Sequence, residues 1–204
     1  MSTEKQGKIS QGGNWITPKV RFNWVHVFKA QKGQKRDDGT MGEDKFSCTA
    51  LFEKDADFTL AKKVASDALV ERFGERMKQP AFVAKLRKPF RDQGEKANEK
   101  GELPPGYTAG CIFITASGKQ RPGVVDANGA DILQETDIYS GCYGRLALRA
   151  YTYDNKGNVG VAFGLQNVQK LADGEPLGGR SRPSDDFEPV AQAETAGATN
   201  SVFD

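Results

Sequence analysis

The alternation of apolar and polar residues is clearest between residues 139 and 171, where it predicts a long β-hairpin. Successive side chains of a strand point to opposite faces. One face of the first strand is therefore apolar or small, with Cys142, Gly144, Leu146, Leu148, Ala150 and Thr152. The other face is aromatic and basic, with Tyr143, Arg145, Arg149, Tyr151 and Tyr153.

A predicted turn at Lys156-Gly157, flanked by two asparagines, sets the register of this hairpin, because Gly and Asn tolerate the positive φ of tight turns. On the apolar face the register pairs Leu148 with Leu165, Ala150 with Phe163 and Thr152 with Val161. On the other face it pairs Arg149 with Gly164, Tyr151 with Ala162 and Tyr153 with Gly160. Rings above such small residues leave room for stacked bases, as in single-stranded nucleic-acid platforms. A solvated face on which tyrosine simply favours strands is the alternative.

Alternation also predicts strands over residues 19–28, 45–52 and 109–117. In the first of these, one inner face is predicted to hold Val20, Phe22, Trp24, His26 and Phe28. Apolar residues at spacings of three and four predict a helix over residues 58–78, with Asp57 as its N-cap. Several short strands with one principal helix indicate a mainly β fold. We expect an OB-type five-stranded barrel with an extended hairpin, and a β-sandwich is the alternative.

The two ends of the chain differ in composition from this body. Residues 1–18 are polar and predict a flexible arm, anchored by Trp15 and Ile16. Residues 19–180 form the predicted barrel domain. The periodic pattern ends after residue 172, and residues 181–204 are small, polar and acidic, which favours a disordered tail.

The charge is distributed unevenly along the chain. The residues after Arg182 hold five carboxylates and no lysine or arginine, which leaves 22 acidic against 29 basic residues before them, a net charge of +7. A basic body with an acidic tail is typical of nucleic-acid binders, although a solubilising tail has the same composition. Candidate phosphate contacts, for which solvated loops are the alternative, are Lys85, Arg87, Lys88, Arg91, Lys119 and Arg121.

Several other classes are disfavoured. No apolar run approaches the ~20 residues of a membrane helix, and the N-terminus is not a signal peptide, so we expect a cytoplasmic protein. Three separated cysteines and one histidine predict buried thiols, no zinc and no cofactor. No nucleophile elbow or Walker motif is present, so no enzyme is expected. An acidic run could hold magnesium in a nuclease or be a solvated loop: Asp126, Asp131, Glu135 and Asp137.

The chain resembles a family of phage single-stranded DNA-binding proteins, once catalogued as a domain of unknown function and similar to the replication binding protein of T7-like phages. The likeness lies in the segments RFNWVHVFKA, KFSCTALFEK and RPGVVD, in the hairpin with its continuation to Arg180, and in the following DDF. It spans about residues 20–187. The resemblance implies an OB-fold that coats single strands during phage replication and recombination in the host cytoplasm, and a homodimer is one assembly that it allows. A phage structural or decoration protein is the remaining alternative.

The resemblance also implies an acidic, aromatic-tipped tail that recruits replication partners. Relatives in the family end on phenylalanine, whereas here Phe203 is followed by Asp204. Two segments could therefore be the partner motif, Asp185-Asp186-Phe187 and Phe203-Asp204, and both stay open.

Overall fold

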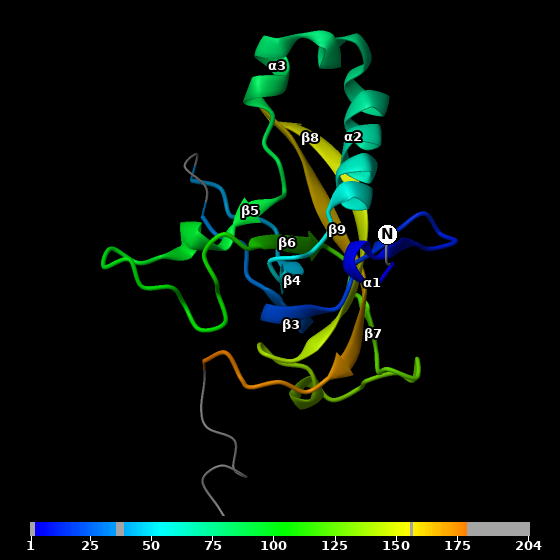
Figure 1. Ribbon diagram of the computed structural model, residues 1–204, viewed down its shortest axis with the longest axis vertical. Coiled ribbons are helices and arrows are strands. Elements are labelled where there is room, and N and C mark those ends of the chain that lie inside the picture. The colour runs from blue at the N-terminus through cyan, green and yellow to red at the C-terminus, as the bar shows by residue number, and fades with distance from the viewer. Residues whose placement is uncertain (1–2, 36–38, 156, 179–204) are drawn as a thin grey trace, which may run out of the picture.

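The computed structural model describes residues 3–35, 39–155 and 157–178, and five of its strands close into a ring (Figure 1). In ring order the strands are β3 (Val20–Gln31), β4 (Lys45–Leu51), β6 (Ile112–Gly118), β9 (Asn158–Ala172) and β8 (Tyr143–Asn155), and β8 pairs back to β3. This is the strand order of an OB-type barrel, so the predicted mainly β barrel is confirmed over the β-sandwich.

Short elements decorate the ring. Paired at its edges are β1 (Lys8–Ile9), β2 (Trp15–Ile16), β5 (Arg91–Asp92) and β7 (Gly123–Val125). The helical elements are α1 (Thr3–Gln6), α2 (Thr59–Phe73), η1 (Gly74–Lys78), α3 (Pro80–Lys85), η2 (Gln93–Lys96) and η3 (Glu135–Asp137). The principal helix is α2, as predicted, and its C-terminal turn continues as η1. The Asp57 carboxylate accepts the Thr59 N–H at 2.8 Å, although the N-cap itself is Phe58.

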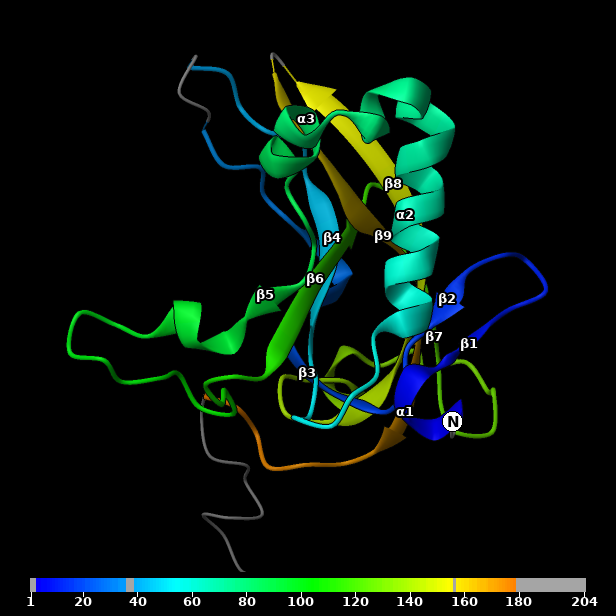
Figure 2. The same cartoon turned by 45° about the horizontal axis from the view of Figure 1, so that its top comes forward.

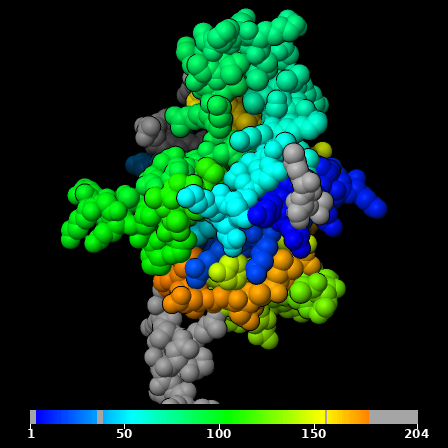
Figure 3. Space-filling model, viewed as in Figure 1, coloured from blue at the N-terminus to red at the C-terminus, as the bar shows by residue number. Residues whose placement is uncertain are grey.

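The β8–β9 hairpin has the predicted register in every pair that the turn fixes, from Leu148 opposite Leu165 to Tyr153 opposite Gly160. Its free end extends beyond the ring, where α2 runs alongside it and α3 lies near its tip (Figures 1 and 2). In the orientation of Figure 1, the helices and neighbouring segments cover most of the free end of the hairpin (Figure 3). The helices bury the apolar face, including Val161 and Phe163. The opposite, outer face of the hairpin carries Arg149, Tyr151 and Tyr153, and Arg149 also lines a pocket with the α2 residues Lys63, Asp67 and Glu71.

The prediction for β3 is wrong beyond Phe22. Val20 and Phe22 are buried, but Trp24 is 61% exposed and has a φ of 48°. The register slips by one residue between Asn23, which pairs with Thr49, and His26, which pairs with Ser47. A bulge adds one residue to a strand and reverses its alternation. After this bulge the odd position Val27 is buried instead, so Trp24 and His26 do not continue the inner face, although Phe28 still packs partly against the core.

The N-terminal residues contribute to the core. Trp15 is fully buried, stacks on Phe52 at 6.2 Å between ring centroids, and donates its indole N–H to the Gln6 carbonyl. Through β2 it pairs with β8, so Trp15 and Ile16 lie against the ring. The expected mobility of residues 1–18 stays a prediction. The expected disorder of residues 181–204 concerns a segment outside the described residues.

The three cysteines Cys48, Cys111 and Cys142 are buried free thiols, as predicted, and burial raises the pKa of Cys48 and of Cys142. Within the described ranges, no helix has the length and apolar character needed to cross a membrane.

Candidate nucleic-acid interface

One row of paired residues crosses all five strands of the ring on its outer face. His26 pairs with Ser47, Ser47 with Ser117, Ser117 with Gly164, and Gly164 with Arg149. We call this set the outer-face row. Its four inter-strand steps of about 4.8 Å span roughly 19 Å along the surface. Its centre consists of two serines and a glycine, while an imidazole and a guanidinium stand at its ends.

Two tyrosines stand over a floor of glycine beside this row. A Cβ placed on Gly164 would lie 3.7 Å from Cδ1 of Tyr151, and one placed on Gly160 would lie 2.6 Å from the Tyr153 hydroxyl. Tyr151 is 44% exposed. Partial burial, and secondly the neighbouring Tyr153, raise the pKa of Tyr151, so its ring is neutral at physiological pH. Arg87 and the Tyr153 hydroxyl occupy the space above Gly160, whereas above Gly164 no atom lies closer than 3.5 Å to the Cβ position, so the floor is open beside Tyr151.

The loop between β3 and β4 forms the facing wall of a groove of about 340 Å³, whose floor is Ser47, Thr115 and Ser117. The loop side is lined by Gln31, Lys32, Gly33, Gln34, Gly42, Glu43 and Lys45. Lys119, one of the predicted basic residues, forms an ion pair with Glu43 at 2.6 Å. The groove thus has a small polar floor and a rim that carries several cations.

A basic segment borders the tyrosines on the other side of β9. The Arg87 N–H donates to the Val159 carbonyl at 2.9 Å, and the Arg87 carbonyl accepts from Val161 at 3.1 Å. Arg87 is thereby bridged to Gly160, beneath the Tyr153 hydroxyl. A strand-like pairing fixes this cation next to an aromatic ring.

The remaining predicted basic side chains differ in their exposure and in the partners that they already have. Lys85 and Lys88 are exposed near Arg87. Arg91 is also exposed, but its guanidinium donates twice to the Glu95 carboxylate, at 2.7 and 2.9 Å. Arg121 lies over the Phe28 ring at 4.9 Å. Arg91 is therefore the least available of the set to a new anion.

The structure does not bring Tyr143 and Arg145 to the groove. The Tyr143 ring has Lys19 at 4.8 Å and Arg21 at 5.7 Å from its centroid, and Gly174 packs against its edge. Arg145 lines a separate small pocket with residues of the N-terminal segment. The continuous platform that the alternation predicts is thus divided, and only Arg149, Tyr151 and Tyr153 remain beside the row.

Trp24 is a candidate that the sequence did not reveal. The bulge turns its indole outward next to Asn23, whose partner Thr49 is two residues from Ser47 on the same face of β4. Buried Tyr107 is its neighbour: burial raises the pKa of Tyr107, and the Asn23 and Trp24 side chains partly oppose this. A tryptophan in an alternating strand is normally predicted to be buried, so only the backbone geometry at the bulge shows that Trp24 is exposed.

The acidic run proposed as a magnesium site has ordinary local partners. The Asp126 carboxylate accepts the N–H groups of Asn128 and Ala130 at 2.8 Å, and Glu135 pairs with Lys29 at 2.6 Å. Within the part of the chain that the structure describes, no three His, Cys, Asp or Glu side chains gather in a way that could hold a metal ion.

Comparison with known proteins decides the family. The model of the single-stranded DNA-binding protein of Enterobacter phage Enc34 matches residues 14–198. The chain belongs to this family. It is a family of DNA-binding proteins rather than enzymes, so the nuclease interpretation of the acidic run falls away.

Solved structures of relatives have the same fold. The Enc34 protein in complex with single-stranded DNA is 24% identical, with a TM-score of 0.63 over 87% of this chain and 97% of that one. The single-stranded DNA-binding protein gp2.5 of bacteriophage T7 is 11% identical, with a TM-score of 0.52 over 87% of this chain and 98% of that one. Protein p50 of Acyrthosiphon pisum secondary endosymbiont phage 1 is 38% identical over 91 residues, 44% of this chain. The chain spans about half the length of that curated relative (48%).

Proposed function

We propose that this protein binds single-stranded DNA without sequence preference, with the strand lying along the outer-face row at right angles to the β-strands. Family membership supports the ligand, since the Enc34 protein is a single-stranded DNA-binding protein. The observation that supports this binding mode is the outer-face row, whose serines and glycine lie beside the exposed rings of Tyr151 and Trp24. We further propose a role in phage DNA replication and recombination in the host cytoplasm.

Base stacking supplies the part of the affinity that ignores sequence. Tyr151 and Tyr153 offer rings at one end of the face, and Trp24 offers an exposed indole at the other. Every base has a π-face, so each stacked ring contributes about 1–3 kcal/mol whatever the base.

Phosphate neutralisation supplies the salt-dependent part. Arg149 lies in the row, Lys32 and Lys45 line the groove beside Ser47 and Ser117, and the predicted cations Arg87, Lys88, Lys85, Lys119 and Arg121 are further candidates for phosphate contacts. With about four phosphates neutralised, log affinity falls against log salt with a slope near −3, since each single-strand contact adds about 0.7.

A fluorescence titration with poly-dT at two salt concentrations tests this function. The intrinsic emission of exposed Trp24 and Tyr151 should be quenched on binding, and affinity should fall at the higher salt. A double variant Lys62→Gln, Arg72→Gln, which removes two exposed cations from α2, is the matched control and should keep the wild-type slope. Absence of binding, or a slope of zero, would refute the proposal.

We also propose that the acidic tail recruits replication or recombination proteins and competes with DNA for the groove. The residues concerned are Asp185, Asp186, Phe187, Phe203 and Asp204, all outside the described residues. Deleting residues 184–204 removes five carboxylates that can mimic a phosphate chain, so DNA affinity should rise while partner binding falls. Equal DNA affinity of the full and truncated chains would count against this role. Sedimentation of both forms would show whether a homodimer exists and whether it needs the tail.

A further inference from the structure

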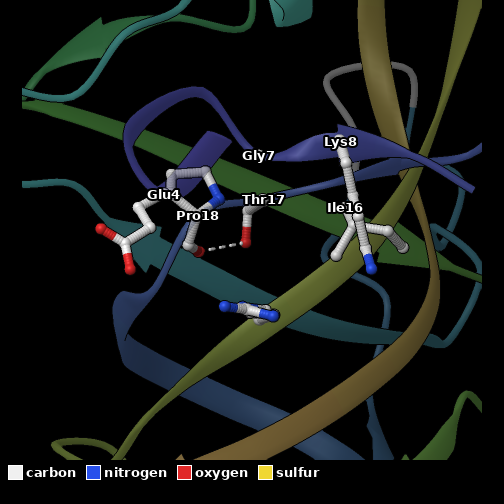
Figure 4. Close-up of a pocket in the computed structure, with 7 residues that line it drawn as sticks. Glu4, Gly7, Lys8, Ile16, Thr17 and Pro18 are labelled. Carbon is white, nitrogen blue, oxygen red and sulfur yellow. Dashed lines mark hydrogen bonds between the residues drawn. The ribbon is translucent and has the colours of Figure 1, made fainter. Parts of the chain in front are cut away.

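A small pocket between the N-terminal segment and β8 has no role in the groove. It has a volume of about 160 Å³ and is lined by Glu4, Gly7, Lys8, Ile16, Thr17, Pro18 and Arg145. Figure 4 shows Glu4 and Lys8 on opposite sides of it, with the Thr17 hydroxyl between them. That hydroxyl donates to the Pro18 carbonyl at 2.9 Å, so its proton is already used.

The backbone at Gly7 shapes this pocket. Gly7 has a φ of +76°, and a Cβ at this position would lie 2.0 Å from the Ile16 carbonyl oxygen. Only glycine allows this approach of two backbone segments. The pocket is therefore a fixed feature of how the N-terminal segment packs on β8.

Arg145 brings an unused donor to the pocket. Its Nε–H is buried and, among the described residues, has no hydrogen-bond partner. Gln169 is paired with Arg145 across the hairpin, but its amide nitrogen donates to the carbonyls of Asp126 and Ala127, and its Oε1 does not accept from the Arg145 Nε–H. Buried guanidinium N–H groups normally have an acceptor, so this donor indicates a ligand that supplies one.

We infer that this pocket binds one phosphate group of the DNA strand after the strand leaves the groove. The inference rests on the proposed function and extends it to a second contact. A phosphate offers oxygens to the planar fork of Arg145 and to the ammonium of Lys8, which together outweigh the single carboxylate of Glu4.

The position of the pocket fits this ligand. Arg145 and Arg149 occupy odd positions of β8 four residues apart, about 13 Å at roughly 3.3 Å per residue. Arg149 ends the outer-face row, so a strand that crosses the row and then turns along β8 toward its N-terminal end reaches Arg145 next. The DNA contact then continues along β8 instead of ending at the row.

A direct test observes the Arg145 Nε–H in ¹⁵N–¹H spectra of the full chain, with Arg145→Lys identifying its signal. Oligo-dT of about 4 nucleotides, the lower end of the range of about 4–16 for one OB-fold, is short enough to stay within the outer-face row, whereas about 30 nucleotides exceeds that range. The signal should shift with the long oligonucleotide and stay in place with the short one. No shift with the long oligonucleotide, or an equal shift with the short one, would overturn the inference. The inference would also be overturned if the Arg145 signal shifts when residues 179–204 are deleted in the absence of DNA but does not shift when DNA is added. The pocket would then bind carboxylates of the tail rather than a phosphate.

A binding test uses Lys8→Gln, Arg145→Gln against the control Lys62→Gln, Arg72→Gln, which removes the same charge elsewhere. Loss of one phosphate contact should lower the salt slope by about 0.7 for the long oligonucleotide and leave the short one unchanged. If Arg145→Gln lowers the melting temperature, Lys8→Gln alone, at an exposed side chain, should still weaken binding of the long oligonucleotide only. Equal slopes for the two double variants would overturn the inference. Failure of every protein to bind either oligonucleotide would instead refute the proposed function.

Discussion

The two ends of strand β8 carry the same kind of residues and have opposite surroundings. At the ring end, Tyr143 lies under Lys19 and against Gly174, and Arg145 faces the N-terminal segment. At the free end, Tyr151 and Tyr153 stand over glycines. The local alternation assigns all four side chains to one face. Segments distant in sequence then cover one end and leave the other open, so a strand pattern identifies a face but not an accessible surface.

The largest expected effect comes from removing the open rings. Tyr151→Ala, Tyr153→Ala should weaken binding of oligo-dT by about 1–3 kcal/mol for each ring, because each is expected to stack one base. Tyr143→Ala, at the covered end, should leave DNA affinity close to wild type and lower thermal stability instead. Fluorescence anisotropy with labelled dT, together with thermal melts, separates the two outcomes. An equal loss of affinity for Tyr143→Ala would show that the covered end also binds bases.

The two glycines of the open end should differ in whether they tolerate a larger side chain, with Gly164 tolerating alanine and Gly160 not. A Cβ on Gly160 would lie 2.6 Å from both the Arg87 carbonyl and the Tyr153 hydroxyl, so Gly160→Ala must displace the basic segment and the ring. We expect it to lose about 1–3 kcal/mol of stability, as overpacked sites do, and to weaken DNA binding.

Gly164 has more space around its Cα than Gly160 has. A Cβ there meets nothing closer than 3.5 Å, so Gly164→Ala should fold normally and bind nearly as well as wild type. Gly164→Val fills the floor beside Tyr151 and should cost up to one stacked base, about 1–3 kcal/mol. Melting temperatures and affinities of the three variants check the assignment. Normal DNA binding by Gly164→Val would mean that the strand does not lie on this floor.

The contrast between β8 and β3 shows how much of the site the sequence could predict. The hairpin register follows from a local turn and strict parity, and both are visible in the residues. In β3 the parity breaks at a bulge, which depends on pairing with β4 and left no signature around Trp24. The cover over Tyr143 comes from Lys19, Arg21 and Gly174, which are distant from it along the chain, so no local pattern could indicate it.

Trp24 offers a way to separate its ring from its backbone. A non-glycine residue at positive φ stores strain of order 1–3 kcal/mol, which Trp24→Gly should relieve and Trp24→Ala should not. Both variants lose the indole, so both should weaken DNA binding by about 1–3 kcal/mol. We therefore expect equal affinities and a higher melting temperature for the glycine variant. Wild-type affinity in both variants would remove the β3 end from the interface.

The smallest expected effect concerns two ion pairs, one at the groove wall and one near the covered end of β8. Glu43 holds Lys119 at the groove wall, and Asp173 holds Lys170 near the covered end. Glu43→Gln should release a cation to a phosphate, tighten DNA binding and steepen the salt slope by about 0.7. The gain should stay within about 1 kcal/mol, because exposed pairs are weak. With an oligonucleotide of about 4 nucleotides, which stays within the outer-face row, Asp173→Asn releases an equal charge where no strand is expected to lie, so its slope should equal wild type. Identical slopes for the two variants would mean that the position of the released cation is irrelevant and that only net charge attracts the DNA.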